Sequence, residues 1–468
     1  MLGPSCKAKV ANCRSVRLSI APNPLELYGL PSHSGPFTEF ISVQPVLAHA
    51  LESEDSAIPV VPRVGPSASS CERCSGPPST PHPNLTADWY GLATLRPMLG
   101  LLVRLALVMV VHCATCPASI VPALPTNVSS VHPGHVSLVM AMGDSITAGF
   151  AASGVSLYES REISWSIGAG WQGRQYGLTL PGLLAKYTDA AITGHSLAGA
   201  SAKEVLPRDI TKLPHGDYHP ATDHLNVAES MGAVMLGSLD EQWKLLTSAL
   251  AGYADAASRW KVLTLFMVAN DSCDQCDAPL SASFLETWSN RTSQLLQAIA
   301  DHPNMTRTYV NIVSLLDLSH VARVQRESVW CKLKHDVVKE CGCITPKASS
   351  AQLAQVDANV HVLNQRLHQL ATLHTHKARA NGRADLAFVA QPFLEGAGPR
   401  LTLDFLSDLD CFHPSESAHQ ELAIGLWNTM LCHDRATLCD AGGPTFPQPN
   451  LTAACASAST VFYTPPWV

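Results

Sequence analysis

Two short motifs at opposite ends of the chain contain residue types that can perform nucleophilic catalysis. Ser145 lies in Gly143-Asp-Ser-Ile-Thr-Ala-Gly149, directly after an apolar run, and Asp410-Cys-Phe-His413 precedes a stretch with helical spacing of apolar residues. A serine hydroxyl attacks an acyl carbon when a histidine accepts its proton, and a carboxylate must orient that histidine. The short spacing of Asp410 and His413 lets the carboxylate meet one ring nitrogen while the other faces Ser145. We therefore predict Ser145 as nucleophile, His413 as general base and Asp410 as the orienting acid.

Each motif alone also has a structural interpretation. Gly-Asp-Ser is a common turn and helix-cap tripeptide, and an aspartate three residues before a histidine commonly caps a helix. Finding both motifs at opposite ends of one predicted domain favours catalysis. His195 and His419 are rival bases that we interpret as structural or surface histidines, and the spacing to the histidine disfavours Asp408 as the acid. We expect Asp144 and Asp271 to cap helices or to accept backbone hydrogen bonds near the site.

The elements that must position these residues form the pattern of an α/β domain. Short β-branched or apolar runs alternate with stretches of helical spacing, which is typical of a parallel sheet covered by helices. Such a sheet presents a nucleophile at the carboxyl edge of a strand, where a helix beginning after Ser145 directs its positive end at a developing anion. We predict one domain over residues 117–436. Its expected strands are Val136–Met142, Ala191–Thr193, His224–Val227, Val262–Val268, Thr308–Val313 and Leu386–Ala390, and its expected helices lie over Leu239–Ala256, Ser281–Ala300, Ala351–Arg379 and Ser415–Leu431.

Composition limits the class of protein. The 468 residues carry a net charge of −7, with 15% charged and 46% apolar residues, which suits a large buried core and argues against nucleic-acid binding. Of the 33 prolines, 14 precede Met98, where no sustained helical or strand periodicity appears. We interpret residues 1–97 as an unstructured, proline-rich leader or as an extension of the gene model upstream of a true start at Met98.

A charged and apolar stretch at residues 98–116 has the pattern of a secretory signal. Arg104 is followed by Leu-Ala-Leu-Val-Met-Val-Val111 and by a small-residue tail that ends at Cys116. The segment is either the cleaved signal peptide of a chain that begins at Met98 or an uncleaved signal anchor through residues 98–112. The cost of about 2.5–3.5 kcal/mol for an arginine inside a spanning helix favours the cleaved signal. Either alternative places the later residues in a secretory lumen or outside the cell.

Cysteines and glycosylation sequons agree with an oxidising compartment. Sequons that follow the signal begin at Asn127, Asn290, Asn304 and Asn450. Nine cysteines follow the signal, and their odd number means either that Cys116 survives cleavage and pairs or that one thiol stays free. We expect disulfides and no metal, because the cysteine pairs lack the spacing of a four-ligand zinc site. These cysteines are Cys273, Cys276, Cys331, Cys341, Cys343, Cys411, Cys432, Cys439 and Cys455, the last two lying in residues 437–468, which we expect to pack on the domain as a C-terminal tail.

The blocks around the two motifs resemble the SGNH, or GDSL, hydrolase superfamily and, within it, the phospholipase B branch. Gly-Asp-Ser near the start and Asp-x-x-His near the end look like the first and last blocks of that superfamily. The similarity covers nearly everything from Leu124 to Cys432. The matching blocks are Leu124–Val128, Met142–Gly149, Ser164–Gly168, Thr179–Pro181, Ile192–Ser196, Trp260–Phe266, Gln391–Phe393 and Asp410–His413.

The resemblance implies a three-layer SGNH-hydrolase fold, similar to flavodoxin, with a central and mostly parallel sheet flanked by helices. It also implies an oxyanion hole formed by the amides of Ser145 and Gly232 and by the side chain of Asn270. Preorganised donors of this kind stabilise an oxyanion by about 2.7–4 kcal/mol each. No metal or organic cofactor is required. Asn270-Asp-Ser272 is also a sequon, which we predict to be unused because a glycan there would block the site.

Three positions depart from the family pattern. Val268 stands where the asparagine block begins with glycine, Met231 is an extra residue before Gly232, and Gly170 replaces a usual acidic residue. A displaced oxyanion glycine would lower the rate. Because the serine, the aspartate and the histidine are all present, we expect an active enzyme rather than a decayed relative.

The expected function is that of a secreted serine esterase that hydrolyses acyl ester bonds of phospholipids or lysophospholipids through an acyl-enzyme. The lipid substrate follows from the resemblance alone, since a fold does not fix a function. The alternatives are a general short-chain or carbohydrate esterase of the same fold and a secreted binding protein on a decayed hydrolase scaffold. The expected partners are a lipid or ester substrate and, transiently, a membrane surface, with no nucleic acid and no obligate protein partner. Residues Ala200–Pro220 and Val324–Pro346 are the expected cover loops.

Overall fold

The computed structural model describes residue 116 and residues 120–154, 158–170, 178–197, 218–273, 275–335, 340–433 and 451–466. All of these residues lie in one unit that spans Asp88–Val468. The interpretations of residues 1–97 and of the signal segment before Cys116 concern residues outside this description. So does the expected cover loop over Ala200–Pro220, except for its last three residues.

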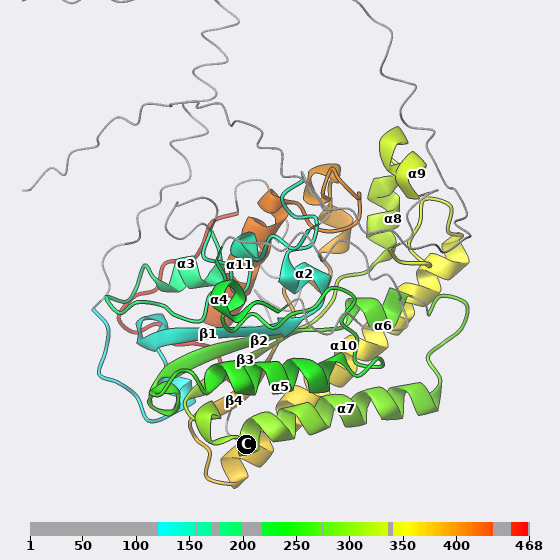
Figure 1. Cartoon of the computed structure of the whole chain (residues 1–468). Helices are drawn as coiled ribbons and strands as arrows, with labels where there is room; N and C mark the ends of the chain where they lie inside the picture. Colours follow the sequence, from blue (N-terminus) through cyan, green and yellow to red (C-terminus); the bar gives the residue numbers. More distant parts are fainter. Residues whose placement is uncertain are drawn as a thin grey trace, which may run out of the picture. The chain divides into compact units, whose positions relative to one another are not determined.

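A sheet of four parallel strands forms the centre of the described domain (Figure 1). Each strand pairs with the next one along the chain, in the order β1 (Val136–Gly143), β2 (Trp260–Phe266), β3 (Thr308–Val313) and β4 (Leu386–Gln391). Almost every residue of these strands is buried, as in sheets that helices cover on both faces. The predicted α/β class with a parallel sheet is confirmed, and the predictions for these four strands are right to within two residues at each end.

Two further predicted strands do not form and instead touch β1 at single points. Thr193 and Asn226 each make one parallel bridge with β1. Backbone geometry stops both segments from extending, because Gly194 and His224 have φ values of 89° and 51°, in the left-handed region. Two short passes of chain therefore cover the free edge of β1.

Helices lie on both faces of the sheet (Figure 1). One face carries α5 (Ser238–Leu250), α7 (Ala282–Asp301) and α10 (Ser350–Ala380), and the other carries α3 (Leu180–Leu184) and α11 (Glu416–Leu431). The serines that precede α7, α10 and α11 each accept a backbone N–H from the first turn, which explains why these helices begin where they do. This arrangement confirms the predicted three-layer fold.

Shorter helices lie in the connections between these elements. They are α2 (Ser145–Ala148), α4 (Pro220–Asp223), α6 (Ala269–Cys273), α8 (Ser319–Gln325) and α9 (Val329–His335), with single 3-10 turns over Val128–Ser130, Pro133–His135, Arg161–Ile163, Ala256–Ser258, Pro303–Met305, Gly398–Arg400 and Leu403–Phe405. The expected cover loop over Val324–Pro346 thus contains the end of α8 and all of α9. None of the described helices combines the length and the apolar character that crossing a bilayer requires.

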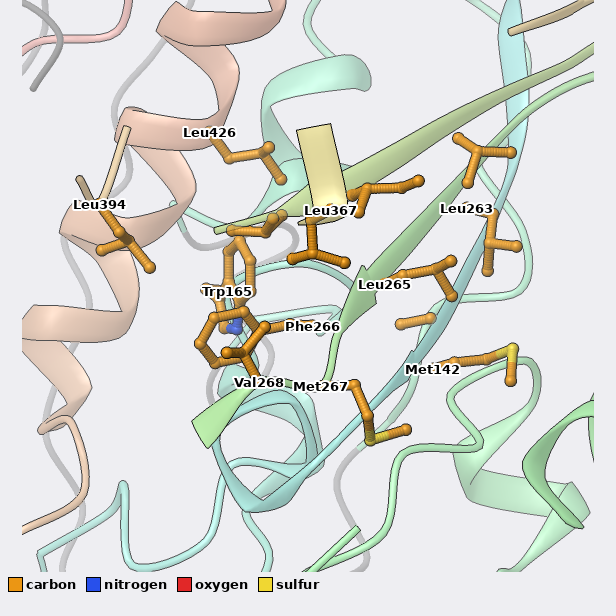
Figure 2. Close-up of a cluster of buried hydrophobic side chains, with 14 of the residues drawn as sticks. Met142, Trp165, Leu263, Leu265, Phe266, Met267, Val268, Leu367, Leu394 and Leu426 are labelled. Atoms are coloured by element: carbon orange, nitrogen blue, oxygen red, sulfur yellow. The ribbon is translucent and has the colours of Figure 1, made fainter. Parts of the chain in front are cut away.

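Apolar side chains from the sheet and from both helix layers form a continuous core (Figure 2). Trp165 lies edge-on to Phe266, with ring centroids 5.9 Å apart. Leu367 of α10 and Leu426 of α11 belong to the same cluster, although the two helices cover opposite faces of the sheet. Val268 is 1% exposed and lies in this core as well. The side chain at this departure from the family pattern therefore serves packing.

Four disulfides link distant parts of the described chain, which confirms the prediction of disulfide bonds. The pairs are Cys116–Cys455, Cys273–Cys341, Cys276–Cys343 and Cys331–Cys411. Of the two alternatives for the odd cysteine count, the structure has Cys116 paired, and Cys432 is also disulfide-bonded. Residues 451–466 lie against the domain, where Phe462 is buried and its N–H donates to the Val131 carbonyl at 2.9 Å.

The close approach at Gly194 predicts a measurable cost of adding a methyl group there. A Cβ on Gly194 would lie 2.2 Å from the Val139 carbonyl oxygen of β1, in addition to the strain of a left-handed φ. Gly382 has a similar φ of 77° and no atom within 4 Å of its Cβ position, so it is a matched control for strain alone. Gly382→Ala should lower the free energy of unfolding by about 1–2 kcal/mol, and Gly194→Ala should lower it by at least about 1 kcal/mol more. Equal losses in urea unfolding would contradict the close contact.

Candidate active site

Ser145 begins the turn that follows β1. Gly143 pairs with Phe266 in the last register of the sheet, and the Asp144 N–H donates to the Phe266 carbonyl at 3.2 Å, so the end of the strand is fixed. A Cβ on Gly143 would lie 2.4 Å from the Thr147 hydroxyl oxygen, which explains why glycine occupies this position. Ser145 is then the first residue of α2 and stands half-buried at the carboxyl edge of the sheet.

The structure brings Ser145, His413 and Asp410 together in one chain of contacts. His413 Nε2 lies 2.8 Å from Ser145 Oγ, and His413 Nδ1 lies 2.6 Å from Asp410 Oδ2. The serine and the carboxylate contact opposite nitrogens of one imidazole, which is the geometry that a base needs to take a proton from a serine. His413 and Asp410 are buried, whereas Ser145 remains accessible to solvent.

The environment of His413 increases its basicity. Burial alone would lower the pKa of His413, but the charge of Asp410 and its hydrogen bond raise that pKa above the ordinary value. Burial likewise opposes ionisation of Asp410, but His413 and two backbone amides hold the pKa of this carboxyl below its usual range. The rings of Phe150 and Phe412 both pack against the imidazole of His413, with centroid distances of 4.9 and 5.2 Å. When His413 accepts a proton, the charged carboxylate of Asp410 therefore stabilises the resulting imidazolium.

A closed turn over residues 407–413 fixes the aspartate and the histidine relative to each other. Asp410 Oδ1 accepts two backbone N–H groups of the turn, at 2.9 and 3.0 Å. The Ser407 N–H donates to the His413 carbonyl at 2.7 Å and closes the turn. Cys411 has a φ of 58°, in the left-handed region, and its disulfide to Cys331 ties the turn to α9.

The loop that contains Gly232 meets Asn270 close to the end of β1. Asn270 Nδ2 donates to the Gly232 carbonyl at 2.9 Å, which leaves the second amide hydrogen available. The Gly232 N–H donates to the Glu229 carbonyl at 2.9 Å and so closes a turn. Met231, the extra residue of this loop, has a φ of 65° and is 42% exposed. Within the described part of the chain, the amides of Ser145 and Met231 have no acceptor.

Gln242 on α5 holds the backbone of Gly143 with two hydrogen bonds. Its Oε1 accepts the Gly143 N–H at 2.9 Å, and its Nε2 donates to the Gly143 carbonyl at 2.8 Å. The side chain is 1% exposed. Sequence analysis did not single out this residue, although a glutamine on the inner face of a predicted amphipathic helix was a visible signal.

A buried ion pair organises the loop that leads to Met231. Arg161 and Glu159 lie 2.5 Å apart, measured from Nη2 to Oε2, and both are buried. Arg161 also donates to the carbonyls of Asn226 and Ala228 at 2.9 Å each, while Glu159 Oε1 accepts the Ser230 hydroxyl at 2.6 Å. Together these contacts fix the loop against β1. Sequence analysis missed this pair, because no local pattern links it to a loop about 65 residues downstream.

Asp144 and Asp271 accept backbone hydrogen bonds, as predicted. Asp144 Oδ1 caps α2 by accepting a backbone N–H at 2.9 Å, while its Oδ2 has no partner among the described residues. Asp271 accepts the N–H groups of Val234 and Met235 at 2.9 Å each and the indole N–H of Trp288 at 3.0 Å. Burial raises the pKa of Asp144 to about 7 and that of Asp271 to about 6.

The rival candidates for base and acid have other roles. His419 is buried inside α11, where its Nδ1 accepts the Trp165 N–H at 3.3 Å and burial lowers its pKa to about 3. The carbonyl of His195 contacts the imidazole of His224, and burial lowers the pKa of His195. Asp408 contributes its backbone carbonyl to a lysine of α9. The two histidines are therefore structural, and neither replaces His413.

A second group of serine, histidine and carboxylate lies at a cavity of about 310 Å³ beyond the ends of β3 and β4. Ser314 Oγ lies 3.0 Å from His368 Nε2, and Glu395 Oε1 lies 2.7 Å from the same nitrogen. A serine and a carboxylate that share one nitrogen cannot act as donor and orienter of the same imidazole, so this group lacks the geometry seen at Ser145. Within the described ranges, no three His, Cys, Asp or Glu side chains are arranged to hold a metal ion.

Comparison with known proteins finds a family model and several relatives that match the described domain. Residues 139–426 match the family model of GDSL-like lipases and acylhydrolases. The chain is also similar to proteins named phospholipase B1, membrane-associated: 27% identical over 320 residues in Mus musculus, 27% over 323 in Homo sapiens and 29% over 328 in Rattus norvegicus. Each alignment covers 66% of this chain and 19%, 20% and 20% of the respective relative. The chain spans about a fifth of the length of the curated relatives it matches.

The buried Asp144 predicts a pH dependence of stability that Asp144→Asn should remove. Its pKa in the folded protein is about 7, against an ordinary value of 3.8, so the folded state binds the proton more tightly than the unfolded chain does. Stability should therefore fall as the pH rises from about 4 to about 7, and the cost should persist above that range. Asparagine keeps the cap and cannot ionise. Urea unfolding at about pH 5 and pH 8 should show a gain in the stability of Asp144→Asn over the parent that is larger at the higher pH. A gain that is equal at both pH values would mean an ordinary pKa for Asp144.

Proposed function

Because the chain belongs to the GDSL-like lipase and acylhydrolase family, we propose that it is a secreted serine esterase that hydrolyses acyl ester bonds of phospholipids or lysophospholipids. The observation that carries the proposal is the alignment of Ser145 Oγ, 2.8 Å from one nitrogen of His413, with Asp410 at the other nitrogen. In a family of ester hydrolases, this arrangement supports the proposal that Ser145, His413 and Asp410 are the catalytic residues.

The proposed reaction proceeds through an acyl-enzyme. His413 Nε2 takes the proton of Ser145 Oγ while that oxygen forms a bond to the ester carbonyl carbon. When the tetrahedral intermediate collapses, the bond to the alcohol oxygen breaks and His413 returns the proton to that oxygen. A water molecule then attacks the acyl carbon while His413 takes its proton. The bond between the acyl carbon and Ser145 Oγ breaks, His413 returns the proton to Oγ, and the fatty acid leaves. Asp410 stabilises the imidazolium in both steps, as the raised pKa of His413 supports.

The proposed oxyanion hole consists of the Ser145 amide, the side chain of Asn270 and Gly232. The Ser145 amide has no hydrogen-bond acceptor among the described residues. The Asn270 side chain has one amide hydrogen left after its bond to the Gly232 carbonyl. The Gly232 amide becomes a donor only when its turn bond to the Glu229 carbonyl opens. By the general magnitude for such donors, each of the two available donors would stabilise the oxyanion by about 2.7–4 kcal/mol.

The lipid substrate and the secretory location have different support. The similar proteins are named phospholipases and membrane-associated, which supports an acyl-lipid substrate over a soluble short-chain or sugar ester. The disulfides of the described chain support an oxidising compartment. A decayed binding protein is the contrasting proposal, and the intact contacts of Ser145, His413 and Asp410 argue against it.

A fluorophosphonate probe should label the secreted protein, and Ser145→Ala should abolish labelling. The probe reacts only with a serine whose proton a base removes, so it reports the nucleophile independently of any substrate. In parallel, hydrolysis should be measured on short soluble esters and on phospholipid and lysophospholipid micelles. Failure of the parent to label would support a binding protein. Hydrolysis of soluble short esters alone would support the general esterase.

Asn270→Ala should lower kcat by about 10²–10³-fold with little change in KM, because the lost donor acts on the oxyanion and not on the bound ester. Asn270 also begins a sequon, so Asn270→Ala removes a potential glycosylation site together with the hydrogen-bond donor. Ser272→Ala is the matched control, since it removes the sequon and keeps Asn270; the Ser272 hydroxyl donates a hydrogen bond to the Val268 carbonyl, at 3.0 Å, and to no other acceptor among the described residues. Equal losses in both variants, or a glycan on Asn270 in a peptide map, would contradict the role of Asn270.

A further inference from the structure

Helix α9 exposes its apolar side chains to solvent. Val329 is 82% exposed, Trp330 57% and Leu333 59%, whereas Cys331 is 2% exposed. A helix on the surface of a globular domain ordinarily turns its apolar stripe inward and its charged residues outward. The outward orientation of the apolar side chains of α9 leaves an exposed apolar patch, which marks an interaction surface.

The helical geometry gathers these side chains on one face. Successive residues lie about 100° apart around a helix of 3.6 residues per turn. Val329, Leu333 and Trp330 then fall within one arc of about 100°, with Cys331 on the opposite side. Lys332 and Lys334 flank the arc, and α9 contains no acidic residue, although the whole chain carries a net charge of −7. The apolar face is therefore bordered by positive charge on both sides. We define Val329, Trp330 and Leu333 as the α9 face.

The inner side of α9 is fastened to the turn that carries the catalytic histidine. The disulfide Cys331–Cys411 joins the helix to a residue two positions before His413. Lys334 Nζ donates to the Asp408 carbonyl and lies 4.6 Å from the centroid of the Trp330 ring. In Figure 1, α9 follows α8 at the margin of the described domain, away from the sheet. The α9 face thus points outward from the same structure that positions the base.

We propose that the α9 face is an interfacial anchor that inserts into the surface of a lipid aggregate with anionic headgroups. Aliphatic residues with a tryptophan, bordered by lysines, are the composition of helices that lie in the plane of a bilayer interface. Tryptophan favours the headgroup level, and lysine attracts anionic lipids. The proposal deepens the proposed function and rests on it for the lipid substrate.

The anchor explains how an ester inside a lipid layer reaches a serine at the edge of a sheet. Insertion of α9 brings the attached turn, and with it His413, next to the interface. An acyl ester then needs to leave the layer only over a short distance to meet Ser145. Soluble esters reach Ser145 directly, because this residue is half-buried and accessible without the anchor.

The test measures binding of the full chain to vesicles in the Ser145→Ala background, where no lipid is consumed. The vesicles contain phosphatidylcholine with about a third phosphatidylserine. The triple variant Val329→Ser, Trp330→Ser, Leu333→Ser should bind at least about tenfold more weakly. Leu373→Ser, on α10, is the matched control, because Leu373 is also an exposed leucine, at 45%, and lies outside α9. Lys332→Glu should weaken binding to the anionic vesicles and leave binding to pure phosphatidylcholine unchanged.

Activity separates the anchor from the catalytic site. With Ser145 restored, the triple variant should lose hydrolysis of vesicle phospholipid by about the same factor as its binding and keep hydrolysis of a soluble short ester. Binding of the triple variant equal to that of Leu373→Ser would overturn the anchor. So would a parent that is dimeric in solution and becomes monomeric in the triple variant, since a second copy would then cover the α9 face. Vesicle binding by a parent that no fluorophosphonate labels would reject the proposed function and leave the anchor standing.

Discussion

Buried carboxylates that accept backbone amide protons hold the loops at the carboxyl edge of the sheet. A carboxylate removed from water is unfavourable unless hydrogen bonds or a cation replace its hydration. The loops supply hydrogen bonds that offset part of this cost, so each carboxylate and the loop that it holds depend on one another. The positions of Ser145, Asn270 and His413 follow from this constraint. The carboxylates and their amide donors are Asp144 with Ile146, Glu159 with Ser230, Asp271 with Val234 and Met235, and Asp410 with Phe412 and His413.

Sequence patterns predicted the parts of the structure that depend on local order. β1 and β3 are short runs of mainly apolar and β-branched residues, α10 begins at a Ser-x-x-Gln capping box, and the three residues that the structure brings together lie in two short motifs. Patterns did not predict Gln242 or Arg161, because their partners lie 99 and 65 positions away. The role of a buried polar residue depends on what the fold places opposite it. The segments that contain Thr193 and Asn226 were wrongly predicted to be strands, because the residue types in a segment do not show that its backbone has a left-handed φ.

The three departures from the family pattern differ in their physical consequences. Val268 fills the core, and its side chain faces away from solvent. Gly170 has a φ of 100°, which an acidic side chain adopts only with strain. Met231 lengthens the loop, and the Gly232 amide closes a turn to Glu229. Only this last departure reaches atoms beside the end of β1, so the change that bears on the oxyanion is one of backbone length rather than of side-chain chemistry.

The disulfide Cys116–Cys455 makes the described domain a covalent ring, because it joins residues 339 positions apart. A single cut in the chain between these cysteines opens the ring and leaves both fragments in one molecule. The fragments then meet at the high effective concentration of an intramolecular contact, whatever the dilution. Cleavage of one peptide bond between these two cysteines therefore does not by itself separate the two fragments. A protease that cuts once yields a two-chain protein rather than two pieces that diffuse apart.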